Sequence, residues 1–174
     1  IVDWVKDFCA SKKISSWHIL FPSAKDSDLL TELDCHQRSA IQFHWFNQDY
    51  SDFQDYLSCF VSRKRKNIKK ERSRIKEQAI EMEMVTGSEI SPEYWSAFYD
   101  FYQMTYVKRS GHGGYLSKDF FLSVLPKMGD QVVMSVAKIT SRPVAAALYF
   151  KSSNTLYGRY WGCTAEYDFL HFEA

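Results

Sequence analysis

The stretch that decides the fold is Gln131–Cys163, which reads QVVMSVAKITSRPVAAALYFKSSNTLYGRYWGC. Turn-forming residues divide it into three apolar segments, which are Gln131–Ile139, Val144–Lys151 and Thr155–Cys163. Such segments are typical of strands, and connections as short as Ser141-Arg142-Pro143 and Ser152-Ser153-Asn154 favour antiparallel hairpins. The stretch therefore predicts a three-stranded antiparallel meander. Strand periodicity further predicts that Tyr157, Arg159 and Trp161 share one face, and that Leu156, Tyr160 and Gly162 share the other.

Upstream of the meander the sequence predicts one strand followed by two helices. Glu81–Val85 alternates and ends at Gly87, as a strand does. Ser91-Pro92-Glu93 is a strong helix start, with serine as the N-cap and proline in the first turn. A stripe of aromatic residues follows at helical spacing: Trp95, Phe98, Tyr99, Tyr102 and Tyr106. A second helix begins at Ser117. The fold class is therefore α/β with a mixed sheet that contains the antiparallel meander.

Residues 51–80 predict one long, strongly basic helix. Nine Lys or Arg residues fall within Arg63–Lys76. Leu57, Val61, Ile68, Ile75 and Ala79 form a narrow apolar stripe, which we expect to dock on the protein. A face this basic is suited to phosphate groups, but it is also what a merely solvated helix presents. An anionic lipid-linked precursor is a further candidate partner.

The first fifty residues predict the order helix, strand, helix, strand. Helical spacing covers residues 1–14, and the apolar run Trp17–Phe21 before Pro22 predicts a buried strand. Ser27 or Asp28 is expected to cap the next helix. Ser39–Asn47 then alternates as a half-buried strand does. We interpret His44 in this strand, and the adjacent pair Cys35-His36, as structural.

Composition excludes several classes of function. The four cysteines are scattered without a CxxC pair, so we predict no metal site. No apolar run has the roughly 18 to 20 residues that a membrane-spanning helix needs, and no signal-peptide pattern opens the chain. These features predict a cytoplasmic protein with reduced thiols. Both ends fall inside expected helices, so we expect a piece of a longer chain.

Four motifs carry a family resemblance. They are QFHWFN at Gln42–Asn47, SRKRKNIKKER at Ser62–Arg72, YGRYWGC at Tyr157–Cys163 and LHFE at Leu170–Glu173. In this order they resemble the FemAB-like predicted N-acyltransferases, a group related to peptidoglycan biosynthesis and recognition. The order of one strand, two helices and an antiparallel meander is likewise similar to a GNAT-type acyltransferase.

The resemblance implies two GNAT-like units in tandem. Residues 1–50 would be the C-terminal part of the first unit, 51–80 the basic linking helix, and 81–174 the N-terminal part of the second. The implied reaction moves an acyl or aminoacyl group from acyl-CoA or aminoacyl-tRNA to an amine, which belongs to a small molecule or a cell-wall precursor. Such a reaction requires aligned reactants, an oxyanion donor and a proton acceptor.

The last strand and the residues after it are the expected donor and catalytic region. Gly158 and Gly162 flank Arg159 and Trp161, which predicts close backbone approach to a donor. Arg159-x-x-Gly162 resembles half of the RxxGxG/A pyrophosphate loop of coenzyme A users, but Thr164 replaces its second small residue. We predict His171, Glu173 and Tyr160 as catalytic candidates. His171 is the preferred general base because histidine titrates near neutrality, whereas a helix would turn Glu173 away from it by about 200°.

The acceptor is expected near the glycine-rich loop. His112, Tyr102 and Tyr115 are the candidate cleft residues, and the loop that begins at Gly111 is either a lid or an exposed turn. The aromatic stripe is either core or the wall of this cleft. On the basic helix, Arg63, Arg65, Lys66, Lys69 and Arg72 are the candidate ligands for anions or tRNA. The alternative function is a non-catalytic domain that recognises nucleic acid or a peptidoglycan precursor.

Overall fold

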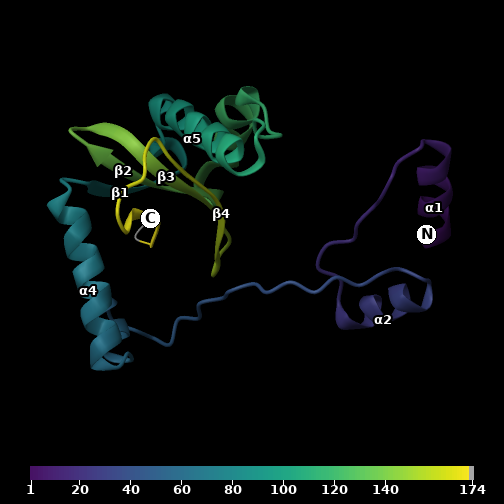
Figure 1. Cartoon of the computed structure of the whole chain (residues 1–174), viewed down its shortest axis with the longest axis horizontal. Coiled ribbons are helices and arrows are strands. Elements are labelled where there is room, and N and C mark those ends of the chain that lie inside the picture. The colour runs from purple at the N-terminus through teal and green to yellow at the C-terminus, as the bar shows by residue number, and fades with distance from the viewer. Residues whose placement is uncertain (173–174) are drawn as a thin grey trace. The chain divides into compact units, whose positions relative to one another are not determined.

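The computed structural model describes residues 1–172. The chain forms two compact units, and the boundary between them falls between Asp49 and Tyr50. The first contains two short helices, α1 (Val2–Ser11) and α2 (Ala24–Glu32). The second contains the remaining helices and the whole sheet (Figure 1). Whether the two units are parts of tandem GNAT-like repeats stays a prediction.

The first unit corrects three expectations. Neither Trp17–Phe21 nor Ser39–Asn47 forms a strand. Phe43 in the second of these segments is 94% exposed, and no strand in its own unit is present to pair with it. A strand needs a hydrogen-bonding neighbour, which its own sequence does not supply. The cap of α2 is Ser23 rather than Ser27 or Asp28, because the Ser23 hydroxyl accepts from the Asp26 N–H at 3.2 Å.

The basic segment forms two helices instead of one, α3 (Phe53–Ser58) and α4 (Ser62–Glu77). The Arg65 guanidinium donates to the Phe60 carbonyl at 3.0 Å and so satisfies a backbone group at the break. The expected apolar stripe docks only in part. Leu57 and Ile75 are buried, whereas Val61 in the break is 76% exposed, and Ala79 lies beyond the helix in the left-handed region.

The predicted elements of the second unit are confirmed. They are β1 (Glu81–Thr86), α5 (Pro92–Ser110), β2 (Val132–Ile139), β3 (Arg142–Lys151) and β4 (Leu156–Cys163). The Ser91 hydroxyl accepts from the Tyr94 N–H at 3.2 Å and caps α5. The helix after Ser117 is present as the π-helical turn η2 (Phe120–Val124), which η3 (Leu125–Gln131) continues. Short 3-10 turns η1 (Gly87–Glu89) and η4 (Leu170–Phe172) complete the unit.

Within the described residues the sheet has the order β1-β2-β3-β4 with antiparallel neighbours throughout, so the expected mixed sheet is wrong. One face packs against α5, η2 and η3 (Figure 1). The opposite face meets the end of α4 and η4 through Ile75, Ile80 and Leu170. β4 is an edge strand of this sheet.

A β-bulge in β4 corrects the expected alternation. Leu148 pairs with Tyr160, but the next residue, Tyr149, pairs with Gly158, so Arg159 is the additional residue. Phe150 therefore pairs with Tyr157. Phe150 and Leu148 both pack in the core beside α5. Tyr157 consequently shares a face with Tyr160 and not with Trp161.

Candidate active site

A hollow of about 380 Å³ lies at the edge of β4, and we call it the β4-edge hollow. The last turns of α5 form one wall, the end of β4 forms another, and the segment after β4 closes the third side. Its lining residues are Thr105, Lys108, Arg109, Trp161, Cys163, Ala165, Glu166, Tyr167, Asp168, Phe169, Leu170 and His171.

Trp161 lines this hollow, and its backbone polar groups lie at the edge of the sheet. The Thr105 hydroxyl lies 3.1 Å from the Trp161 carbonyl oxygen and 3.0 Å from that of Phe101. This contact comes from α5, so the Trp161 carbonyl points away from β3. In an antiparallel strand the N–H and C=O of one residue point to the same side. The Trp161 N–H is therefore directed to the free edge, where it can donate to a bound oxygen.

Charged groups of both signs surround the hollow. The Lys108 ammonium lies 3.9 Å from a Glu166 carboxylate oxygen, and both side chains are more than half exposed. The His171 ring meets the Trp161 ring edge-on, with centroids 5.4 Å apart. Burial raises the pKa of the Cys163 thiol, and the nearby Lys108 charge opposes that rise only in part. Cys163 is therefore a neutral thiol in the wall at pH 7.

The structure separates the predicted catalytic residues. His171 lies at the hollow beside Trp161, a predicted donor-binding residue. Tyr160 lies on the other face of β4, where its ring packs edge-on against Tyr102 at 5.2 Å. Glu173 lies outside the described residues. Of the two predicted catalytic residues that the structure describes, His171 lines the hollow and Tyr160 does not.

The predicted donor residues are also divided. Arg159 is exposed, and its guanidinium lies over the Tyr160 ring at 4.5 Å instead of lining the hollow. A Cβ built on Gly162 would lie 2.5 Å from the Phe101 carbonyl oxygen. The close approach at Gly162 is therefore made by α5. Gly158 has open space, because a Cβ there would be no closer than 3.8 Å to Tyr149.

The predicted acceptor residues do come together. We define the aromatic cluster as Tyr102, Tyr106, His112 and Tyr115. Ring centroids are 4.9 Å apart for Tyr102 and Tyr106, 5.7 Å for Tyr106 and Tyr115, and 5.4 Å for His112 and Tyr115. Tyr102 is buried, whereas Tyr115 is 81% exposed. The cluster therefore runs from the core to the surface.

The loop that carries His112 and Tyr115 is fastened to α5. The Gly114 N–H donates to the Gln103 side-chain oxygen at 2.9 Å, and the Leu116 N–H donates to the Tyr102 hydroxyl at 3.1 Å. A Cβ on Gly114 would overlap the Tyr102 ring. These contacts favour an anchored loop over a mobile lid.

Two of the predicted anion ligands on α4 have structural roles. Arg65 donates to the Phe60 carbonyl at the break between α3 and α4. The Arg72 guanidinium lies 4.2 Å from the centroid of the Phe53 ring in α3. The other three predicted ligands, Arg63, Lys66 and Lys69, are exposed, as are Lys64, Lys70, Arg74 and Lys76. Arg63, Lys66, Lys70 and Arg74 follow one line along the helix, opposite Ile68 and Ile75.

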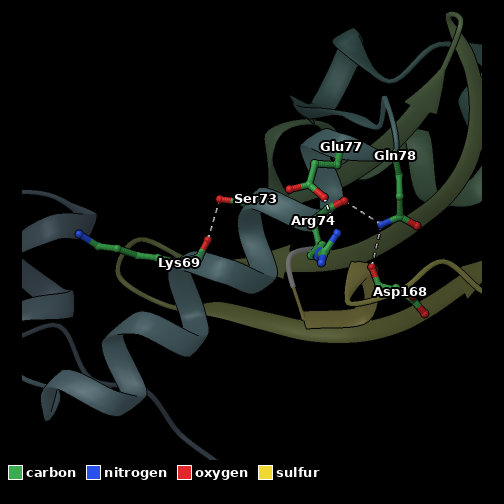
Figure 2. Close-up of polar contacts among 6 residues, drawn as sticks. All are labelled: Lys69, Ser73, Arg74, Glu77, Gln78 and Asp168. Atoms are coloured by element: carbon green, nitrogen blue, oxygen red, sulfur yellow. Dashed lines mark hydrogen bonds and ion pairs between the residues drawn. The ribbon is translucent and has the colours of Figure 1, made fainter.

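A second hollow, of about 530 Å³, lies at the end of α4 and is called the α4 hollow. Lys70, Arg74, Glu77, Gln78, Asp168 and Phe169 line it. Arg74 forms an ion pair with Glu77 at 2.7 Å. Figure 2 shows Gln78 between two elements, donating to the Arg74 carbonyl at 3.1 Å and to the Asp168 carbonyl at 3.0 Å. Gln78 thus fastens the segment that walls both hollows to α4.

Sequence reasoning missed most of the β4-edge hollow. Thr105, Lys108, Arg109, Cys163, Glu166 and Asp168 were not candidates. Lys108 and Arg109 carried one usable signal, because two cations in the last turn of a helix before a glycine-rich loop favour an anion nearby. Thr105 is brought to the hollow only by the packing of α5 on β4, whereas Cys163, Glu166 and Asp168 belong to β4 and the segment after it.

Within residues 1–172, no group of three or more His, Cys, Asp or Glu side chains is arranged to hold a metal ion. The helices of that same range include none long and apolar enough to cross a membrane.

One family model matches residues 1–174, the whole chain, and its description is peptidoglycan biosynthesis/recognition. No curated protein matches the chain.

Proposed function

Because this chain belongs to the FemAB-like family of peptidoglycan biosynthesis/recognition proteins, we propose that it transfers an acyl or aminoacyl group to the amine of a cell-wall precursor. Members of the family are generally transferases of peptidoglycan synthesis. The observation that carries the proposal is the β4-edge hollow, where an outward-facing backbone N–H and a histidine lie beside two cations.

Each wall of the hollow supplies one requirement of acyl transfer. The Trp161 N–H would donate to the oxyanion that forms when the amine attacks the acyl carbon. His171 can accept the proton of the attacking amine, directly or through water. Lys108 and Arg109 can bind the phosphates of the donor. The GNAT-like form of this site is part of the proposal.

The proposed donor is either acyl-CoA or aminoacyl-tRNA, and the charge on α4 favours aminoacyl-tRNA. The line of exposed cations Arg63, Lys66, Lys70 and Arg74 supports tRNA, because several phosphates can be neutralised along one helix. Such a donor also implies a cytoplasmic enzyme. The alternative is a non-catalytic domain that binds anions on α4 and uses the β4-edge hollow for recognition only.

Calorimetry and a transfer assay with each donor test the proposal. We expect His171→Ala to lower kcat by about 100-fold without changing donor affinity. Substitution of both Lys108 and Arg109 by Ala should weaken donor binding instead. A chain that binds neither donor, or in which His171→Ala leaves kcat unchanged, would contradict the catalytic assignment.

Reversal of Arg63, Lys66 and Lys70 to Glu tests the tRNA donor. We expect the fold to survive, tRNA affinity to fall, and the salt dependence of binding to become shallower. Unchanged tRNA affinity at low salt would mean that these cations of α4 only face solvent and do not bind tRNA. Transfer from acyl-CoA by the same triple variant at the normal rate would assign the donor to coenzyme A.

A further inference from the structure

We propose that the aromatic cluster binds an uncharged pyranose ring of the glycan part of the acceptor, with Tyr115 as the stacking residue. This inference rests on the proposed function, because it names the group by which a cell-wall acceptor would be recognised. It assigns a role to Tyr115, which belongs to the aromatic cluster but is exposed and does not belong to the hydrophobic core.

The first step is the combination of exposure and rigidity. Tyr115 is 81% exposed, yet its ring packs edge-on against two others. Its ring centroid lies 5.7 Å from that of Tyr106 and 5.4 Å from that of His112. The backbone beside it is held at two points, by Gln103 and by the Tyr102 hydroxyl. An exposed aromatic ring on a fixed backbone loses little conformational entropy when a ligand binds. The cluster is therefore preorganised for binding.

The second step is the chemistry of the four side chains. None of them is an acid, a lysine or an arginine, so the cluster offers no permanently charged side chain to a phosphate or a carboxylate. The charged residues Lys108 and Arg109 line the β4-edge hollow instead. A pyranose has an apolar face of C–H groups, whose slightly positive hydrogens match the negative face of an aromatic ring. Its rim carries hydroxyl groups that need both donors and acceptors.

The third step is that the cluster offers hydrogen bonds suited to that rim. His112 Nδ1 lies 2.7 Å from the Gly113 carbonyl oxygen. A carbonyl only accepts, so Nδ1 carries a proton, and Nε2 of the neutral ring is an acceptor. The hydroxyl of Tyr115 both donates and accepts. One stacking face with acceptor and donor groups at its side matches an N-acetylated hexosamine better than an anion.

Binding of chitotetraose, a neutral chain of N-acetylglucosamine, to the full chain tests the proposal. Affinity is measured by calorimetry or by the shift of backbone amide resonances. We expect Tyr115→Ala to weaken binding about tenfold and Tyr115→Phe to weaken it much less. Tyr157→Ala is the matched control, since Tyr157 is an exposed aromatic residue outside the cluster, and it should bind as the unmodified chain does.

Two results would overturn the proposal. One is the absence of chitotetraose binding at millimolar concentration, or binding that Tyr115→Ala leaves unchanged. The other is binding of adenosine monophosphate that is tighter than that of chitotetraose and lost in Tyr115→Ala, which would assign the cluster to a nucleobase. The test needs no donor and no turnover. A chain that binds chitotetraose but transfers nothing would therefore contradict the proposed function and support this inference.

Discussion

Gly162 is a residue at which β4 closely approaches α5. A Cβ at this position would lie 2.5 to 2.7 Å from the carbonyl oxygen, carbonyl carbon and Cβ of Phe101. Two of these three atoms belong to the helix backbone, which cannot move aside as a flexible side chain can. We therefore expect Gly162→Ala to destabilise the chain by about 1 to 3 kcal/mol.

Gly158→Ala is the control for this prediction, because a Cβ there would meet only the Tyr149 ring at 3.8 Å. We expect it to change the free energy of unfolding by less than about 0.5 kcal/mol. Urea unfolding of both variants measures the difference. Equal effects at the two positions would show that the contact with Phe101 does not determine stability.

A polar group of three residues joins β1, β2 and α5. The Glu83 carboxylate accepts from the Lys138 ammonium at 2.6 Å and from the Tyr94 hydroxyl at 2.7 Å. The bond from Lys138, and then that from Tyr94, lowers the pKa of Glu83 below its ordinary value of 4.5. A carboxylate with a lowered pKa in the folded state contributes stability above the unfolded pKa and loses it as the pH falls through the folded one.

We therefore expect Glu83→Gln to destabilise the chain at pH 7 and to cost progressively less below about pH 4.5. The effect should be about 1 kcal/mol or less, because the Glu83 side chain is 39% exposed and water weakens the pair. Urea unfolding of both chains from pH 3 to pH 7 measures it. A difference that stays constant over this range would exclude the ionised carboxylate as its source.

At the scale of the element, α3 and α4 are joined by Arg72, whose guanidinium lies over the Phe53 ring at 4.2 Å. A cation over an aromatic ring contributes about 0.5 to 1 kcal/mol at exposed sites. We expect Arg72→Ala to destabilise the chain by about 1 kcal/mol. Lys69→Ala, on the exposed side of the same helix, should stay within about 0.5 kcal/mol. Chemical unfolding compares them, and equal values would mean that α4 is not held through this contact.

Elements were predictable where their signals are local. Ser91-Pro92 marked the start of α5 correctly, and two turns marked the hairpins of β2, β3 and β4. The β-bulge at Arg159 could not be predicted from the sequence, because it depends on how the residues of β3 and β4 pair. The same holds for the site. Trp161 in β4 and His171 after it, both predicted site residues, line the β4-edge hollow, whereas Thr105 lines it only because α5 packs there.

At the scale of the whole molecule, stability is unevenly distributed between the two units. In residues 1–49 the single buried residue is Cys9. The helices α1 and α2 have 10 and 9 residues, and isolated helices shorter than about 12 to 15 residues are marginal in water. Ile41 and Phe43 are 86% and 94% exposed. The buried apolar residues that pack on the two faces of the sheet all lie after Tyr50.

We therefore expect a chain of residues 50–174 to unfold cooperatively with the same urea midpoint as the full chain. Residues 1–49 alone should show no cooperative transition, since a domain needs a buried core to offset its conformational entropy. The shorter chain should also aggregate less, because it lacks the exposed apolar side chains of Ile41 and Phe43. A midpoint clearly below that of the full chain would contradict this, because it would mean that residues 1–49 contribute to the stability of the sheet-bearing unit.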